Sequence, residues 1–154
     1  MTPRMPRRAL LALLLSLAVV PVARAADTEA GYAPQKVVYH NDGGLPDNAK
    51  YFRKILRNAK NHMTAIGKDR IELRMVNHGD GVAMLQMANT EKDLAEQIDG
   101  LRAAGVKFLV CKNTLTALNI DWHTLYGVSE QDLVLSGVAE LVSLQQQGFV
   151  YVHP

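Results

Sequence analysis

The 154-residue chain is close to neutral, with 17 Lys and Arg against 15 Asp and Glu, and it contains one cysteine. A single cysteine excludes an internal disulfide and argues against a dithiol oxidoreductase, because both need a second thiol. Four of the basic residues fall within the first 25 positions, and the rest of the chain has 13 basic and 15 acidic groups. The basic excess therefore gives no indication of nucleic-acid binding.

Residues 1–25 have the pattern of a secretory signal peptide. Three arginines precede an apolar run at 9–20, and Ala-Arg-Ala at 23–25 matches an A-x-A cleavage site. The run is shorter than the roughly 20 apolar residues that a transmembrane helix needs. We therefore predict a secreted or periplasmic protein without a membrane span after cleavage, whose 129 remaining residues comprise a short lead at 26–35 and one domain at 36–154.

The first half of the domain follows a predicted flexible lead at residues 26–35. A strand is expected at 36–40, and the Asn-Asp-Gly-Gly turn at 41–44 ends it. The longest helix is predicted to begin at Pro46 or Asp47 and to end at Gly67, because apolar residues recur at steps of three and four. Its basic face could bind an acidic partner, but a solvated face is the simpler interpretation.

Strands and helices also alternate in the second half. Strands are expected at 70–76, 106–111, 133–135 and 149–152. A short helix is expected at 82–88 with Asp80 as cap, and a longer one runs from a capping box at 90–93 to Gly105. Further helices are expected at 114–119, with Asn113 as cap, and from Ser136-Gly137 to Gly148. One helical turn is expected at 122–126.

This alternation predicts an α/β domain with a mainly parallel sheet of about five strands. Binding sites in such sheets form at the carboxyl ends of the strands. The loops that begin at these ends carry the residues that we consider for a site: Cys111, His40, Asn41, Asp42, His78, Asp80, Asn113 and Ser136.

Cys111 is the first candidate for chemistry because it lies at a predicted strand-to-helix junction. The positive end of a helix and nearby N–H groups favour the thiolate, which is the nucleophilic form. A single thiolate can hold a sulfane sulfur atom as a persulfide. The alternative is that Cys111 is a small buried hydrophobic residue, as free cysteines usually are.

Other chemistries find less support in the sequence. A Cys–His nucleophile needs an imidazole beside Cys111 together with an oxyanion hole, and nothing in the chain specifies either. A metal site from His40, His78 and Cys111 lacks the usual ligand spacing, so we predict neither a metal nor a cofactor. The glycine-containing loops match no phosphate-binding motif.

Two segments give the chain a family resemblance over about residues 36–153. They are Val106 to Cys111 followed by Asn113-Thr114-Leu115, and residues 136–142 followed by Leu144-Gln145, Gln147-Gly148 and Tyr151. With them the chain resembles the DsrE/DsrF-like family of sulfur-relay proteins. That resemblance implies a three-layer α/β/α domain, assembly into homo-oligomers, often trimers or hexamers, and a cysteine, here Cys111, that carries persulfide sulfur to a partner.

The chain departs from the cytoplasmic relay members in one motif. Those members have an Arg-Gly pair downstream of the cysteine, whereas residues 117–120 here are Ala-Leu-Asn-Ile. Our first hypothesis is an exported oligomer that binds or relays sulfane sulfur on Cys111 and exchanges it with a donor or acceptor protein or a small sulfur compound. Ligand-orienting residues around the thiol would be His40, Asn41, Asp80, Asn113 and Ser136. The alternative is a non-catalytic binding or assembly protein with a buried cysteine.

Overall fold

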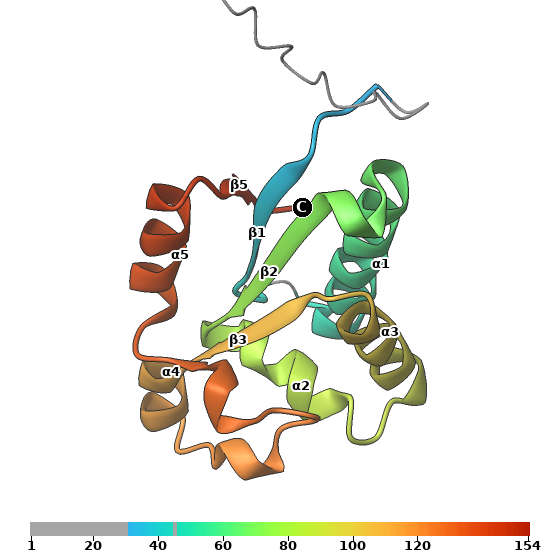
Figure 1. Cartoon of the computed structure of the whole chain (residues 1–154). Helices are drawn as coiled ribbons and strands as arrows, with labels where there is room; N and C mark the ends of the chain where they lie inside the picture. The colour runs from blue at the N-terminus through green and yellow to red at the C-terminus, as the bar shows by residue number, and fades with distance from the viewer. Residues whose placement is uncertain (1–30, 45) are drawn as a thin grey trace, which may run out of the picture.

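The computed structural model describes residues 31–44 and 46–154 and shows five parallel strands between two layers of helices (Figure 1). The strand order is β4-β3-β2-β1-β5. The elements are β1 Gln35–Asn41, α1 Asn48–Ile66, β2 Ile71–Asn77, α2 Ala83–Met87, α3 Lys92–Ala103, β3 Lys107–Cys111, α4 Lys112–Ala117, β4 Leu133–Val134, α5 Gly137–Gln146 and β5 Val150–Val152. The predicted α/β/α fold with a parallel sheet is confirmed.

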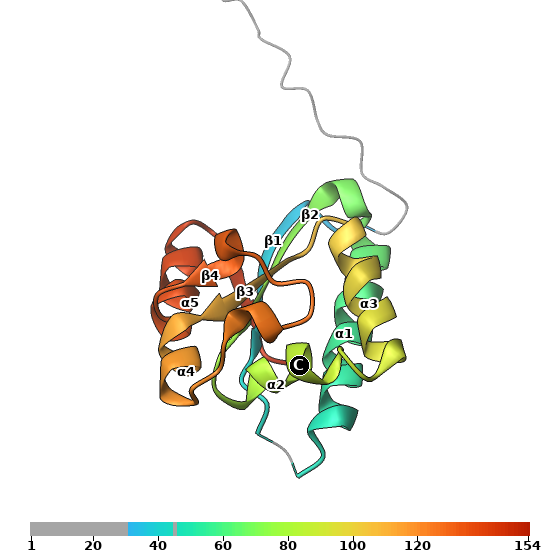
Figure 2. The ribbon, with the colours of Figure 1, turned by 90° about the horizontal axis from the view of Figure 1, so that it is seen from below.

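One face of the sheet carries the larger core. Alternate residues of a strand point to opposite faces, so Tyr39, Met75 and Phe108 lie together beneath α1, α2 and α3. Figure 2 shows α1 and α3 side by side on this face, with α4 and α5 on the other. The two long helices are joined by Arg53 of α1, which binds Glu91 and Asp93 at the start of α3.

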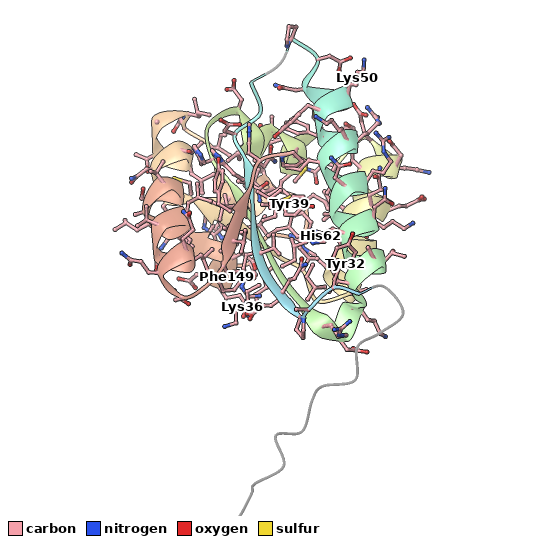
Figure 3. The ribbon with its side chains drawn as sticks, turned by 90° about the horizontal axis from the view of Figure 1, so that it is seen from above. Tyr32, Lys36, Tyr39, Lys50, His62 and Phe149 are labelled. Atoms are coloured by element: carbon pink, nitrogen blue, oxygen red, sulfur yellow. The ribbon has the colours of Figure 1, made fainter. Side chains whose placement is uncertain are left out.

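Helix α1 begins and ends where the sequence predicts. The Asp47 side chain accepts a hydrogen bond from the Lys50 N–H at 2.9 Å, and the Gly67 N–H donates to the Met63 carbonyl at 2.9 Å. Figure 3 shows Tyr39 and His62 between β1 and α1, where the Tyr39 hydroxyl lies 3.2 Å from His62 Nδ1. These contacts fix α1 over the first strand.

The second face is thinner and is covered by α5. Val38, Val76 and Leu109 point to this side and pack with Leu141, Leu144 and Phe149. The Lys36 ammonium lies 5.5 Å from the centre of the Phe149 ring, near the beginning of β1 (Figure 3). The outer side of α5 leaves the apolar side chains of Val138 and Val142 exposed.

The capping box predicted at residues 90–93 is wrong. Helix α3 begins at Lys92, and no side chain caps it. The Thr90 hydroxyl instead donates to the Met87 carbonyl at the end of α2. The carboxylates of Glu91 and Asp93 bind Arg53, so a tertiary ion pair replaces the local cap.

Two further predicted caps are not formed. Helix α4 follows β3 directly, so Cys111 occupies the cap position and Asn113 lies inside the helix. The Asn113 N–H donates to the Leu135 carbonyl at 3.3 Å, which ties the start of α4 to the end of β4. Asp80 caps no helix, because a 3₁₀ turn at Gly79–Val82 precedes α2.

The N-terminal predictions fall mostly outside the described residues. The predicted signal peptide at 1–25 and the first half of the lead lie there. Residues 31–34 have no regular secondary structure, and Gln35 already belongs to β1, one residue before the predicted strand. Among the described residues, no helix combines the length and apolar character needed to cross a membrane.

Candidate functional site at the carboxyl edge of the sheet

All five strands point the same way, so their carboxyl ends meet along one edge of the sheet. At this edge His40 and Asn41 end β1, Asn77 ends β2 and Cys111 ends β3. Ser136 follows β4, and His153 follows β5. The polar residues form two groups, one around the Cys111 thiol and one around the imidazoles.

The Cys111 thiol is buried but is surrounded by hydrogen-bond donors. The residue is 4% exposed. Burial acts to raise the pKa of Cys111, but hydrogen bonds from the Thr114 side chain and from the backbone of Gly137, Thr114 and Asn113 outweigh it. The net result is a pKa below the ordinary value for a thiol, which favours the thiolate.

Two glycines and Thr114 build this environment. The Gly79 N–H donates to the Thr114 hydroxyl oxygen at 2.9 Å, which leaves the hydroxyl hydrogen free to point at the Cys111 sulfur. A Cβ atom on Gly137 would lie 2.8 Å from His78 Cβ and 3.3 Å from Cys111 Cβ. Only glycine allows the first turn of α5 to approach the thiol this closely.

The second group contains three histidines and one carboxylate. His40 Nε2 lies 2.5 Å from His78 Nε2, and His40 Nδ1 lies 2.6 Å from the Tyr151 hydroxyl. His153 Nε2 lies 3.1 Å from Asp42 Oδ1. Burial lowers the pKa of His40, and the neighbouring imidazoles lower it further, although Asp42 acts in the opposite direction.

The carboxylate of Asp42 is stabilised in its charged form. Burial acts to raise its pKa, but the hydrogen bond from His153 and the charge of His40 outweigh this, so the pKa of Asp42 lies below its usual range. The two groups of the edge meet at His78, which contacts His40 through its ring and packs beside Gly137 at the thiol.

Comparison with known proteins identifies this arrangement as a known fold. The DsrE/DsrF-like family matches residues 35–154. The chain belongs to this family. A solved structure of a protein of unknown function from Methanobacterium thermoautotrophicum has 26% sequence identity and a TM-score of 0.64, covering 78% of this chain and 99% of that one. Comparison with curated proteins gave no match.

Within this DsrE-like domain, Asn41 is fully buried and bonded within the protein. Its Nδ2 donates to Asn77 Oδ1 at 2.8 Å and to the Gly81 carbonyl at 3.1 Å. Asn77 in turn donates to the Leu109 carbonyl at 3.0 Å, so the two amides connect three neighbouring strand ends. Asn41 therefore positions the loops of the edge.

The other predicted site residues hold different positions. The Ser136 hydroxyl accepts the Ala139 N–H at 3.3 Å and so caps α5 beside the thiol. The Asn113 backbone lies at the sulfur, while its side chain is exposed. Asp80 is exposed, and its Cβ would be 2.7 Å from a Cβ on Gly43 in the β1 loop. The edge thus brings Cys111, Asn113 and Ser136 together, with His40 and Asn41 in the neighbouring loop.

Sequence reasoning placed Gly137 in a loop of this edge without a role at the thiol, and it missed Thr114, Tyr151 and His153 as members of the edge. Thr114 carries a signal, since a hydroxyl three residues after a thiol at the start of a helix can face it. His153 and Tyr151 carry none, because their approach to His40 depends on β5 pairing with β1. Strand order is not available from a single sequence.

Proposed function

We propose that Cys111 accepts a sulfane sulfur atom and holds it as a persulfide. The observation that carries this proposal is the set of hydrogen bonds to the sulfur from Thr114, Gly137 and Asn113, which lowers the pKa of the thiol. The thiolate is the form that attacks sulfur. The same donors are suited to an anionic outer sulfur atom, which persulfide storage requires.

The proposed reaction is an exchange that needs no external oxidant. The Cys111 thiolate attacks the terminal sulfur of a polysulfide or of a donor persulfide. A new S–S bond forms at Cys111 while the terminal S–S bond of the donor breaks, and the electron pair leaves with the rest of the donor, a thiolate from a persulfide or a polysulfide shorter by one sulfur atom. Release to an acceptor thiolate is the same exchange in the opposite direction.

The 4% exposure of Cys111 favours a small sulfur compound as the donor. The first turn of α5 lies against the thiol, since the Gly137 N–H is bonded to the sulfur and a Cβ on Gly137 would be 3.3 Å from Cys111 Cβ. A small polysulfide needs less displacement of this turn than the active-site loop of a protein donor does.

Mass spectrometry of the intact protein tests the proposal. After incubation with inorganic polysulfide and removal of excess reagent, the wild type should gain about 32 Da for each added sulfur atom. Cys111→Ser should gain none, and Thr116→Val on the exposed side of α4 should load like the wild type. No adduct on the wild type, or an adduct that persists in Cys111→Ser, would reject sulfur loading.

The second candidate is a binding or assembly protein in which Cys111 has only a structural role. The burial of the thiol is the observation in its favour. Labelling of the native protein with a bulky maleimide separates the two functions. Rapid labelling of Cys111 contradicts the structural role, whereas labelling only after unfolding, together with absence of a sulfur adduct, supports it.

We also propose that the protein acts as a homo-oligomer, expected to be a trimer or hexamer, and that it is exported after cleavage following Ala25. Exposed apolar side chains on α5 and just before it support assembly, since Leu135, Val138 and Val142 are 77%, 61% and 51% exposed. Strand β5 also lies at an open edge of the sheet.

Size-exclusion chromatography with light scattering tests the assembly. The wild type should elute as a trimer or hexamer, and Val142→Glu should dissociate it because a charge then enters the apolar interface. Gln86→Glu, an exposed change on α2, is the control and should leave the mass unchanged. A monomeric wild type contradicts the proposal.

A further inference from the structure

The imidazoles at the ends of β1 and β5 form an arrangement that the sulfur chemistry does not use. His40, Asp42 and His153 each offer one ligand atom, and these three atoms lie within 4.8 Å of one another. Two of them come from the β1 end and one from the penultimate residue of the chain. The parallel pairing of β1 with β5 brings them together.

The separations suit a small metal ion. Bonds of about 2.1 Å in a tetrahedral site place neighbouring ligand atoms about 3.4 Å apart. Here His153 Nε2 is 3.1 Å from Asp42 Oδ1, and His40 Nε2 is 4.0 Å from Asp42 Oδ2. These two distances, one to each oxygen of Asp42, bracket the required value, and the three ligand atoms all lie within 4.8 Å of one another.

An outer hydrogen bond already orients one of the imidazoles. The Tyr151 hydroxyl oxygen lies 2.6 Å from His40 Nδ1. In the tautomer with hydrogen on Nδ1, that nitrogen donates to the hydroxyl oxygen. His40 Nε2 then keeps its lone pair for a metal. Such an outer partner on the second ring nitrogen is usual for metal-binding histidines.

The cluster is also accessible to an ion from solvent. The side chain of His40 is 14% exposed, whereas those of Asp42 and His153 are 40% and 44% exposed. One side of the site is thus buried against Tyr151 and His78, and the other is open for water as a fourth ligand. Binding at His40 Nε2 replaces its contact with His78.

We propose that His40, Asp42 and His153 bind one divalent transition-metal ion of the zinc type. Two imidazoles with one carboxylate favour zinc or a neighbouring first-row metal over Mg²⁺ or Ca²⁺, which prefer all-oxygen sites. This ligand set differs from the His40, His78 and Cys111 set considered from the sequence, because it replaces the thiol and His78 with Asp42 and His153. It does not include Cys111, so it stands or fails independently of sulfur loading.

Zn²⁺ titration of the purified protein in competition with a chromophoric chelator provides the test. The wild type should bind one Zn²⁺ per chain. His153→Ala and Asp42→Asn should each weaken binding by at least about tenfold, since even an outer partner of a metal ligand is worth that much. Both side chains are substantially exposed, so neither change removes core packing.

Two controls distinguish this site from adventitious binding. His123 forms a separate exposed pair with Asp121, whose Oδ1 is 2.6 Å from His123 Nδ1, so His123→Ala should leave the Zn²⁺ affinity unchanged. Cys111→Ser should also leave it unchanged. The proposal would be overturned if the wild type bound no Zn²⁺, if His153→Ala and Asp42→Asn kept the wild-type affinity, or if Cys111→Ser lost binding.

Discussion

The thiol group and the histidine group lie on the same edge of the sheet but are built in opposite ways. Around Cys111 the donors are main-chain N–H groups and one hydroxyl, and the sulfur is buried. Around His40 the partners are side chains from distant parts of the chain, and one side is open to solvent. The geometry of the thiol group depends on where helices begin, whereas that of the histidine group depends on which side chains stand at the ends of the strands.

This difference determines which substitutions should affect each group. No substitution other than proline removes a main-chain N–H, so the thiol group should respond most to changes that move the backbone. The histidine group should respond to side-chain truncation, as in His153→Ala, with little change in the fold. Substitutions at Gly137 and Thr114 test the thiol side of this contrast.

Gly137→Ala should have the largest effect, because the added Cβ would lie 2.8 Å from His78 Cβ. Displacement of the first turn of α5 should destabilise the protein by about 1–3 kcal/mol, as overpacking usually does. It should also raise the pKa of Cys111, since the Gly137 N–H moves away from the sulfur. Denaturant unfolding and thiol titration measure the two effects.

Gly100→Ala is the matched control for this substitution. Gly100 lies within α3, and a Cβ there would meet nothing within 4 Å. Alanine in a helix interior is better than glycine by about 0.5–1 kcal/mol, so this variant should be stabilised with the Cys111 pKa unchanged. If both variants shift stability in the same direction, the close approach at Gly137 does not limit the size of the residue at that position.

Thr114→Val should have the next largest effect, on the thiol alone. Valine keeps the shape but removes the hydroxyl that donates to Cys111, so the pKa of the thiol should rise because the thiolate loses a hydrogen bond. The rate of alkylation against pH gives this value. Thr116→Val, an exposed change two residues further along α4, should leave it unchanged; an equal shift in both variants would assign the effect to the helix as a whole.

The sequence predicts most of the architecture because local patterns determine it. Apolar periodicity and turn residues locate every strand and long helix to within a few residues, and Asp47 and Gly67 limit α1 as expected. The caps at Thr90 and Asn113 fail because partners distant in sequence, Arg53 and Leu135, engage those segments. Local rules do not include such tertiary competition.

The site is predicted only in part, because the sequence indicates most of the thiol group but not the histidine group. Much of the thiol group is local, since Cys111, Asn113 and Thr114 lie within four residues at a strand-to-helix junction that can be read directly, whereas the Gly137 N–H comes from the distant helix α5. The histidine group requires the pairing of β1 with β5, which links His40 to Tyr151 across 111 residues. No pattern in a single sequence supplies that pairing.

The smallest predicted effect is on the pH dependence of stability. Folding lowers the pKa of Cys111, so the unfolded chain holds the thiol proton up to a higher pH, near 9.0. As pH rises from the folded pKa toward 9.0, the wild type should therefore gain unfolding free energy relative to Cys111→Ser. Below the folded pKa the difference should be constant. A difference that falls with rising pH would mean that folding raises the thiol pKa.

Titration of Cys111 in the native wild-type protein is the most direct test of the account, because sulfur loading requires a stabilised thiolate. The alkylation rate with a small reagent such as iodoacetamide should rise with a midpoint below 9.0, and the midpoint should return to the ordinary thiol value in denaturant. A native midpoint at or above 9.0 would show that burial outweighs the hydrogen bonds from Thr114 and Gly137, and would contradict the proposed chemistry.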